Sequence, residues 1–167
     1  MCPRWAMVDD MDTEQALKII SSLLEGGWLE SEKTTADELW RLGFSMRNGP
    51  GEELSPGVVQ RELEPPPGID QASLSTLDGE PTGVVFFIAS AADSNNAETK
   101  EVYESLTFSL SQILGSSERV WADEPSPVQW CGDDLDVGLQ PFDRRDSSVM
   151  VWVEHRGRSQ KAELRAH

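Results

Sequence analysis

Few side chains in this sequence are of the types that carry out covalent catalysis or hold a transition metal. The two histidines, His155 and His167, both lie at the C-terminal end, and the two cysteines, Cys2 and Cys131, are far apart. A nucleophile needs a neighbouring base and an orienting group, and zinc needs a cluster of nitrogen and sulfur ligands. We therefore predict no catalytic residues, no metal site and no cofactor, and we expect Cys131 to be a small buried side chain.

Carboxylates are the one abundant chemical group. Asp133, Asp134 and Asp136 surround an expected hairpin turn, where aspartate is common for conformational reasons alone. Their spacing matches part of a calcium loop but lacks the glycine and the distal glutamate of an EF-hand. The functional alternative is an acidic edge that binds a basic partner, to which Asp123 and Glu124 would add. Because carboxylates occur throughout the chain, no particular pair stands out as the acid and base of a hydrolase, and that class of enzyme stays open.

Six tryptophans are many for this length and divide into two groups. Those on expected helix or strand faces are predicted to be core residues: Trp28, Trp40, Trp130 and Trp152. Trp5 and Trp121 lie in polar surroundings and are better placed to anchor a partner at the surface. The predicted partner-binding residues are therefore Trp121, Asp123, Glu124, Asp133, Asp134 and Asp136.

Charge limits the classes of partner. The chain has 30 acidic and 14 basic residues, a net charge of −16. Such a field repels nucleic acid and anionic membranes and attracts basic proteins, although it also serves solubility alone. The N-terminal residues lack the apolar segment of a signal peptide, and the longest apolar run, 83–92, is too short to span a bilayer. We expect a cytoplasmic protein with a basic protein partner.

The first third of the chain predicts two helices. Asp12 can cap a helix whose apolar residues recur at helical spacing over 16–24, after a frayed lead at 1–11. The segment from Thr35 to Glu38 resembles a capping box that begins a second, short helix. Glycines at 26–27 and 43 end the two helices, and proline and glycine make 48–57 a loop.

Strand patterns and one further helix follow. Residues 58–63, 74–77 and 84–88 predict strands, and 84–88 is apolar at every position, as in a central strand. A third helix over 97–114, capped by Asn95 or Asn96, carries one apolar face, which consists of Val102, Leu106, Leu110 and Ile113. Residues 128–130 and 135–139 predict a hairpin, and 149–153 a last strand.

The order of elements is therefore ααβββ(β)αβββ. Strands in two blocks favour an α+β fold, with a mainly antiparallel sheet of about six strands and three helices packed on one face. We expect one acidic domain over 1–154. Residues 155–167 hold four basic residues against one acidic residue, and they predict a flexible tail that can fold back on the acidic domain.

The apolar spacing of this chain resembles that of small uncharacterised actinobacterial proteins. The likeness covers about residues 13–154. It rests on Trp40–Phe44, on Leu106, Leu110 and Leu114-Gly115, on Val128–Trp130, on Leu135–Leu139 and on Val149–Val153; Ser116-Ser117 stand where the pattern usually has proline. Some proteins of this kind are immunity proteins of polymorphic toxin systems, and the resemblance implies that role here.

Two non-enzymatic functions follow from these observations. The leading hypothesis is an immunity-type inhibitor that neutralises a basic toxin, because an acidic surface speeds the capture of such a partner. The alternative is a secretion-chaperone-like or adaptor protein, which would use an exposed sheet or helix face. The sequence does not indicate an oligomeric state.

Overall fold

A single antiparallel sheet forms the framework of the protein. The structure, a computed structural model, describes residues 4–119 and 127–166, with side chains from residue 13 onward. The strand order is β1-β3-β4-β5-β9-β8-β7-β6, and β2 pairs with β3. The strands are β1 (Ser45–Met46), β2 (Glu52–Ser55), β3 (Val58–Glu64), β4 (Ile69–Leu77), β5 (Glu80–Ala91), β6 (Glu118–Arg119), β7 (Val128–Cys131), β8 (Leu135–Phe142) and β9 (Ser147–His155). The α+β class and the antiparallel sheet are as predicted, but the described residues form nine strands where about six were expected.

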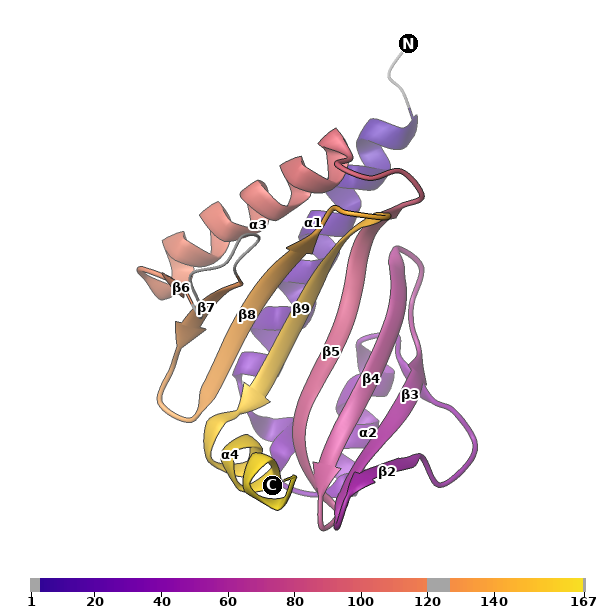
Figure 1. Cartoon of the computed structure of the whole chain (residues 1–167), viewed down its shortest axis with the longest axis vertical. Coiled ribbons are helices and arrows are strands. Elements are labelled where there is room, and N and C mark those ends of the chain that lie inside the picture. Colours follow the sequence, from indigo (N-terminus) through magenta and orange to yellow (C-terminus); the bar gives the residue numbers. More distant parts are fainter. Residues whose placement is uncertain (1–3, 120–126, 167) are drawn as a thin grey trace.

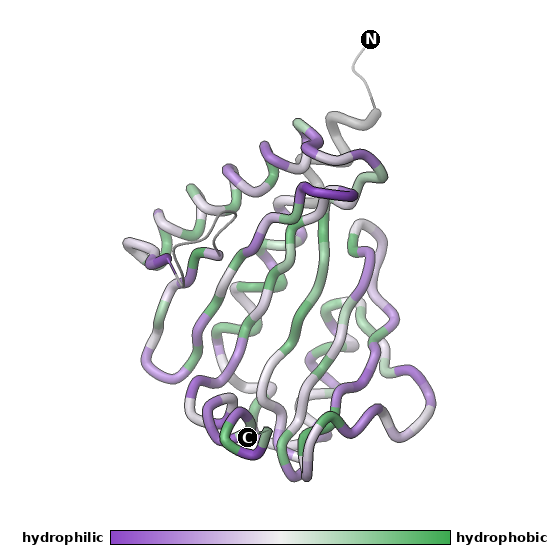
Figure 2. The backbone as a smooth tube through the Cα atoms, viewed as in Figure 1, coloured by the Kyte–Doolittle hydropathy of each residue, from purple (hydrophilic) through white to green (hydrophobic). Residues whose placement is uncertain are grey.

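The two most apolar strands lie side by side at the centre. In the register of β5 and β9, Val84 is opposite Val153 and Phe86 is opposite Val151. All four side chains are fully buried and point toward the helices. The central position predicted for 84–88 is therefore confirmed, and Figure 2 shows the hydrophobic course of this strand.

Three helices cover one face of this sheet: α1 (Arg4–Leu24), α2 (Glu32–Arg41) and α3 (Ala97–Leu114) (Figure 1). A 3-10 turn, η1 (Gly27–Leu29), joins α1 to α2 and buries Trp28. The helices and the sheet enclose one hydrophobic core. Burying a large apolar side chain such as Phe86 contributes roughly 1.5–3 kcal/mol, so this layer supplies most of the folding free energy.

Helix α3 has the predicted limits. The side chain of Asn96 accepts a hydrogen bond from the backbone N–H of Thr99 at 3.0 Å, and the Thr99 hydroxyl donates to the Ala89 carbonyl at 2.6 Å. Val102, Leu106 and Leu110 are buried as expected, but Ile113 is 62% exposed. Ile113, on the last turn of the helix, therefore lies mostly outside the core, although Trp130 Nε1 donates to the Gly115 carbonyl just beyond it at 3.2 Å.

Helix α2 begins one turn earlier than predicted. Ser31, not Thr35, is its N-cap: the Ser31 hydroxyl accepts from the Thr34 N–H at 3.1 Å, and the Thr34 hydroxyl accepts from the Ser31 N–H at 2.8 Å. The Thr35 hydroxyl instead donates to the Trp28 carbonyl at 2.5 Å. The buried face then consists of Thr35 and Leu39, which leaves Trp40 72% exposed rather than in the core.

Two boundaries near the N-terminus also differ from expectation. Helix α1 starts at Arg4 rather than at Asp12, because no glycine or proline interrupts the chain between Pro3 and Gly26. The loop predicted over 48–57 contains β2, which pairs with β3 through a turn at Gly57, where φ is +77°. Within 4–119 and 127–166, none of the helices has the length and apolar character needed to cross a bilayer.

The C-terminal segment, for which no helix was predicted, is helical. Residues Arg156–Arg165 form a fourth helix, α4, which lies at the end of the sheet where β9 finishes and β5 begins (Figure 1). The backbone N–H of Arg158 donates to His155 Nδ1 at 3.1 Å and so caps the helix. The segment folds back on acidic residues, with Arg156, Arg158 and Arg165 paired to Asp136, Glu80 and Asp78.

Candidate functional site

The sheet face opposite α1, α2 and α3 carries a row of apolar side chains and is here called the open face. Val85 and Phe87 of β5 lie on it, directly across from Trp152 and Met150 of β9. All four side chains are only half-buried, in contrast to their neighbours that point toward the helices. No described helix covers this row, since α4 lies only at one end of it (Figure 1).

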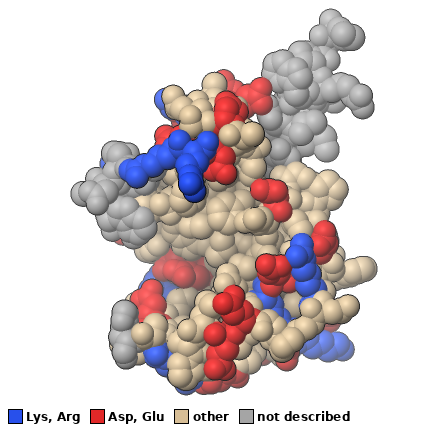
Figure 3. All heavy atoms as spheres, turned by 45° about the vertical axis from the view of Figure 1, so that its right-hand side comes forward, with Lys and Arg blue, Asp and Glu red and all other residues tan. Residues whose placement is uncertain are grey.

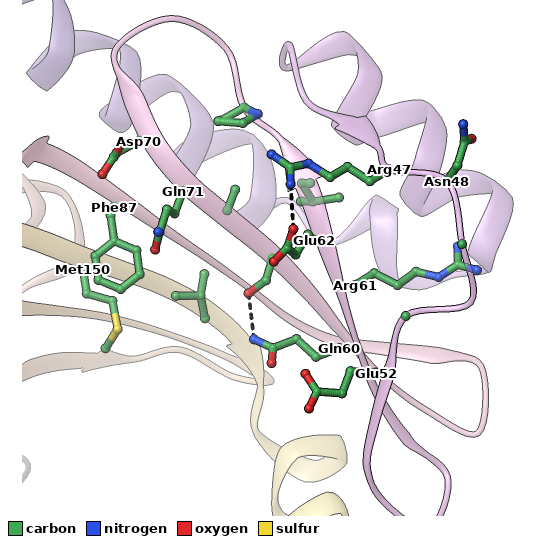
Figure 4. A pocket seen from close by; sticks show the side chains of 17 residues that line it. Arg47, Asn48, Glu52, Gln60, Arg61, Glu62, Asp70, Gln71, Phe87 and Met150 are labelled. Atoms are coloured by element: carbon green, nitrogen blue, oxygen red, sulfur yellow. Dashed lines mark hydrogen bonds and ion pairs between the residues drawn. The ribbon is translucent and has the colours of Figure 1, made fainter.

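One part of the open face is hollowed. A depression of about 770 Å³ lies over β3, β4, β5 and β9 and is bounded at the sheet edge by the loop between β1 and β2. Val85, Phe87 and Met150 form its apolar floor. Figure 4 shows Phe87 and Met150 beside each other, with Gln71 above them. We call this depression the hollow.

Polar side chains form the wall of the hollow. The Gln60 amide donates to the Ser73 hydroxyl at 3.2 Å. Arg47 makes ion pairs with Glu62 at 2.7 Å (Figure 4) and with Glu64 at 3.1 Å, so two carboxylates surround this cation. An apolar floor with an amide, hydroxyl and carboxylate wall suits a polypeptide better than a small anion.

The charged residues lie around the open face rather than on its centre. Figure 3 views this side of the molecule obliquely and shows a band of uncharged surface with charged groups on both sides of it. Charged residues are depleted at the centre of protein interfaces and occur at their rims. The open face has this distribution.

Helix α4 is attached to one end of the open face by an arginine in a nearly buried site. Arg156 Nη2 donates to Asp136 Oδ1 at 2.6 Å and to the Gly132 carbonyl at 2.6 Å, and Nη1 donates to the Asp133 carbonyl at 3.3 Å. The Asp136 side chain is 4% exposed. One guanidinium therefore joins the turn of the β7–β8 hairpin to α4.

Two further arginines attach the rest of α4. Arg158 donates to the carbonyls of Leu29 at 3.1 Å and Pro81 at 3.0 Å and pairs with Glu80 at 3.2 Å. Arg165 makes a two-pronged pair with Asp78, at 2.7 and 2.6 Å. Arg165 also donates to the Pro56 carbonyl at 3.3 Å. The contacts of the three arginines thus reach four places: η1 and the turns between β2 and β3, β4 and β5, and β7 and β8.

Two carboxylates at this end of the sheet have shifted pKa values in opposite directions. Burial raises the pKa of Glu154, and the nearby carboxylates of Asp136 and Glu163 raise it further, against a hydrogen bond from Ser159 that lowers it. The hydrogen bonds from Arg165 lower the pKa of Asp78, with its positive charge acting in the same direction. This end of the open face is therefore acidic beneath α4.

The structure separates the residues that the sequence predicted to bind a partner. Asp133 and Asp134 lie exposed in the β7–β8 turn, as an acidic edge requires. Asp136 does not belong with them: it is buried and engaged by Arg156, because residues of β8 point alternately to opposite faces and Asp136 points under α4. Trp121, Asp123 and Glu124 lie outside the described residues.

The side chains of the hollow were missed by sequence reasoning. Phe87 and Met150 belong to strands that are apolar on both faces, a pattern that predicts a strand covered on both sides. Trp28 and Trp130 are core residues as predicted, whereas Trp152 lies half-exposed on the open face. A useful signal was the alternation of valines with Met150 and Trp152 in β9, which marked two faces of different composition.

Residues suited to catalysis or metal binding are not brought together in the described part of the chain. Cys131 is exposed rather than buried, and its thiol accepts a contact from the Gln129 amide at 3.4 Å. His155 caps α4. Among residues 4–119 and 127–166, no group of three or more histidine, cysteine or carboxylate side chains is arranged to hold a metal ion.

Comparisons with known proteins gave no match: neither a family model, nor a curated protein, nor a solved structure matches this chain.

Proposed function

We propose that this chain is a protein-binding domain that acts in the cytoplasm through the open face of its sheet, without a catalytic step. The observation that carries the proposal is the hollow, where Val85, Phe87 and Met150 remain half-exposed on the two central strands. On soluble proteins, contiguous apolar surface with polar residues around it is a mark of interaction sites. The wall of Gln60, Ser73 and Glu62 would supply the polar rim of such an interface.

Charge favours a basic partner, and a toxin is the leading candidate. The net charge of −16 would accelerate encounter with a basic protein and oppose pairing with a second copy of this chain. An immunity-type inhibitor of a basic toxin fits this chemistry, as does the resemblance of the sequence to immunity-like actinobacterial proteins. The exposed Asp133 and Asp134 would then add to the electrostatic attraction.

Co-expression with neighbouring genes tests this proposal. Each neighbouring reading frame is expressed in a sensitive host with and without this chain, and survival is scored. Rescue from an otherwise lethal neighbour supports the inhibitor function, and its failure with every toxic neighbour contradicts it.

A pair of variants then locates the binding surface. Met150→Lys places a positive charge in the hollow and should abolish rescue, whereas Phe108→Lys makes a matched change at an exposed position of α3 and should preserve it. Urea unfolding of both variants shows whether they remain folded. Equal rescue by the two variants would place the interface elsewhere.

A secretion-chaperone-like or adaptor role is the second candidate, and the mixed apolar and amide lining of the hollow favours it. An extended segment could place apolar side chains on Phe87 and Met150 and polar groups against Gln60 and Gln71. A neighbouring gene for a secreted protein, whose product co-purifies with this chain and is lost with Met150→Lys, would support this role. A neighbour that kills and is rescued would support the inhibitor instead.

A further inference from the structure

Helix α4 is attached to the protein by arginines and by almost no apolar contact. None of its residues is buried, and Leu164, its only large apolar side chain, is 75% exposed. Exposed ion pairs contribute little each, and a helix of 10 residues is marginal on its own in water. The attachment of α4 therefore depends on the polar groups that its arginines contact rather than on hydrophobic packing.

That site is built for a guanidinium group. Asp136 is nearly buried, and its carboxylate shares one guanidinium with the carbonyl oxygens of Gly132 and Asp133. Carbonyls of Leu29 and Pro81 receive a second guanidinium in the same way. Planar arginine, with its five donors, matches such sets of oxygen atoms in a way that lysine does not. Arginine is therefore the chemistry that this end of the sheet accepts.

The site lies on the same face as the hollow. Asp136 and Glu154 are directly opposite each other in β8 and β9, and Trp152, two residues before Glu154, already belongs to the half-exposed row of the open face. Helix α4 thus covers one end of a surface that is otherwise open (Figure 1). If α4 moves away, the open face gains an acidic end.

We propose that the site beneath α4 is a binding site for an arginine-bearing segment of another protein, and that α4 occupies this site in the free chain and is exchanged for that segment. The inference rests on the proposed protein-binding function and names the partner's chemistry. Exchange is favoured over simple release because an empty site would leave the carboxylate of Asp136 buried without its cation. The partner's arginine would take the place of Arg156.

A peptide with the sequence of residues 155–167 is the probe, since it carries arginines in the spacing that the site holds. The host is the full-length chain with R156Q, R158Q and R165Q, in which α4 is retained but cannot compete. At low salt we expect this variant to bind the peptide, as measured by calorimetry. The unmodified chain should bind it about ten-fold or more weakly, because its own α4 has a local concentration in the millimolar range.

Three outcomes overturn the proposal: no binding by the triple variant, equal binding by the unmodified chain, or equal binding of a peptide that carries the same three substitutions. If the triple variant does not fold, amide hydrogen exchange on the unmodified chain decides. Adding the probe peptide in millimolar excess should accelerate exchange in Gln160–Arg165 and leave β5 and β9 protected. If amide hydrogen exchange in α4 stays the same when the peptide is added, the proposal that the peptide displaces α4 is contradicted.

The peptide experiment tests the arginine site and the co-expression experiment tests the inhibitor function, so a negative result in one does not decide the other. Peptide binding without rescue from any toxin would support the arginine site and contradict the inhibitor function. Rescue with no peptide binding would support the inhibitor function and contradict the exchange of α4.

Discussion

Asp136 and Arg156 show how position within a strand decides the role of a charged side chain. Asp133 and Asp134 lie exposed in a turn, whereas Asp136, only two residues further on, has a side chain that is 4% exposed. The sequence Asp-Asp-x-Asp indicated a turn with acidic residues but not which carboxylate would be buried. That difference depends on Arg156, which is distant in sequence and packs on the hairpin only in the folded protein.

Removing the cation of this pair should be more damaging than removing an exposed one. Arg156→Gln leaves the buried carboxylate of Asp136 unpaired, so we expect a clear fall in the urea midpoint of unfolding. Arg165→Gln is the matched control: its partner Asp78 is 57% exposed and can be hydrated, so the midpoint should change little. Equal midpoints for the two variants would show that the Asp136 site is hydrated after the loss of Arg156.

Glu154 should make the stability of the protein depend on pH. Burial raises the pKa of Glu154 in the folded state, so the folded protein holds this proton more tightly than the unfolded chain. The stabilisation is complete below the ordinary glutamate pKa and is lost as pH rises through the raised value. Glu154→Gln, which stays neutral, should therefore be more stable than the parent at pH 7 and nearly equal to it at about pH 4.

Asp78 provides the control of opposite sign for this pH experiment. Arg165 lowers the pKa of Asp78, so its contribution is present above the ordinary aspartate pKa and is lost as pH falls through the lowered value. Asp78→Asn should be only slightly less stable than the parent at pH 7, because the pair is exposed, and the small difference should narrow in acid. Urea titrations across this pH range distinguish the two carboxylates, and a Glu154→Gln variant that is destabilised at pH 7 would contradict the assignment.

At the scale of elements, local signals predicted the limits of one helix and the central strands, but they missed some of the shorter elements. Helix α3 has its predicted limits because Asn96 caps it and Gly115 ends it, both through contacts local in sequence. Strand β2 was missed although its partner β3 is the next strand in sequence, because the proline and glycine residues on both sides of it predicted a loop. Helix α4 was missed because it depends on contacts with residues as far away as Leu29. An uncovered sheet face followed from the prediction that three helices pack on one side, but its apolar side chains did not, since apolar residues on both sides of β5 suggest two covered faces.

The fit between β8 and β9 depends on a glycine. Gly138 is directly opposite Trp152, and a Cβ at Gly138 would overlap the indole ring. Gly138→Ala should therefore force the indole outward and destabilise the protein by about 1–3 kcal/mol.

Gly157→Ala is the control for this substitution. The nearest atom to a Cβ at Gly157 is His155 Cε1 at 3.4 Å, so alanine fits within α4 and should be neutral or stabilising. Thermal unfolding of both variants makes the comparison. A Gly138→Ala variant as stable as the parent would mean that the indole does not pack on this glycine.

At the scale of the whole molecule, charge has two opposite effects on stability: carboxylates repel one another, and the arginines of α4 attract the acidic domain. A net charge of −16 disfavours the compact state through self-repulsion, which salt screens. The arginines of α4 attract the acidic domain, and salt weakens that attraction as well. The acidic domain and its C-terminal helix should therefore respond to ionic strength with opposite signs.

Thermal unfolding and hydrogen exchange can separate these two responses. When NaCl rises from about 10 mM to about 150 mM, the screening length falls from roughly 30 Å to roughly 8 Å. We expect Tm to rise, because repulsion among carboxylates spread over the surface acts over longer distances than the short ion pairs. Amide exchange in Gln160–Arg165 should become faster over the same range, since few apolar contacts hold that helix. A fall in Tm would show that the ion pairs of α4 outweigh the repulsion, and the attachment of α4 would then be a principal source of stability rather than a contact open to exchange.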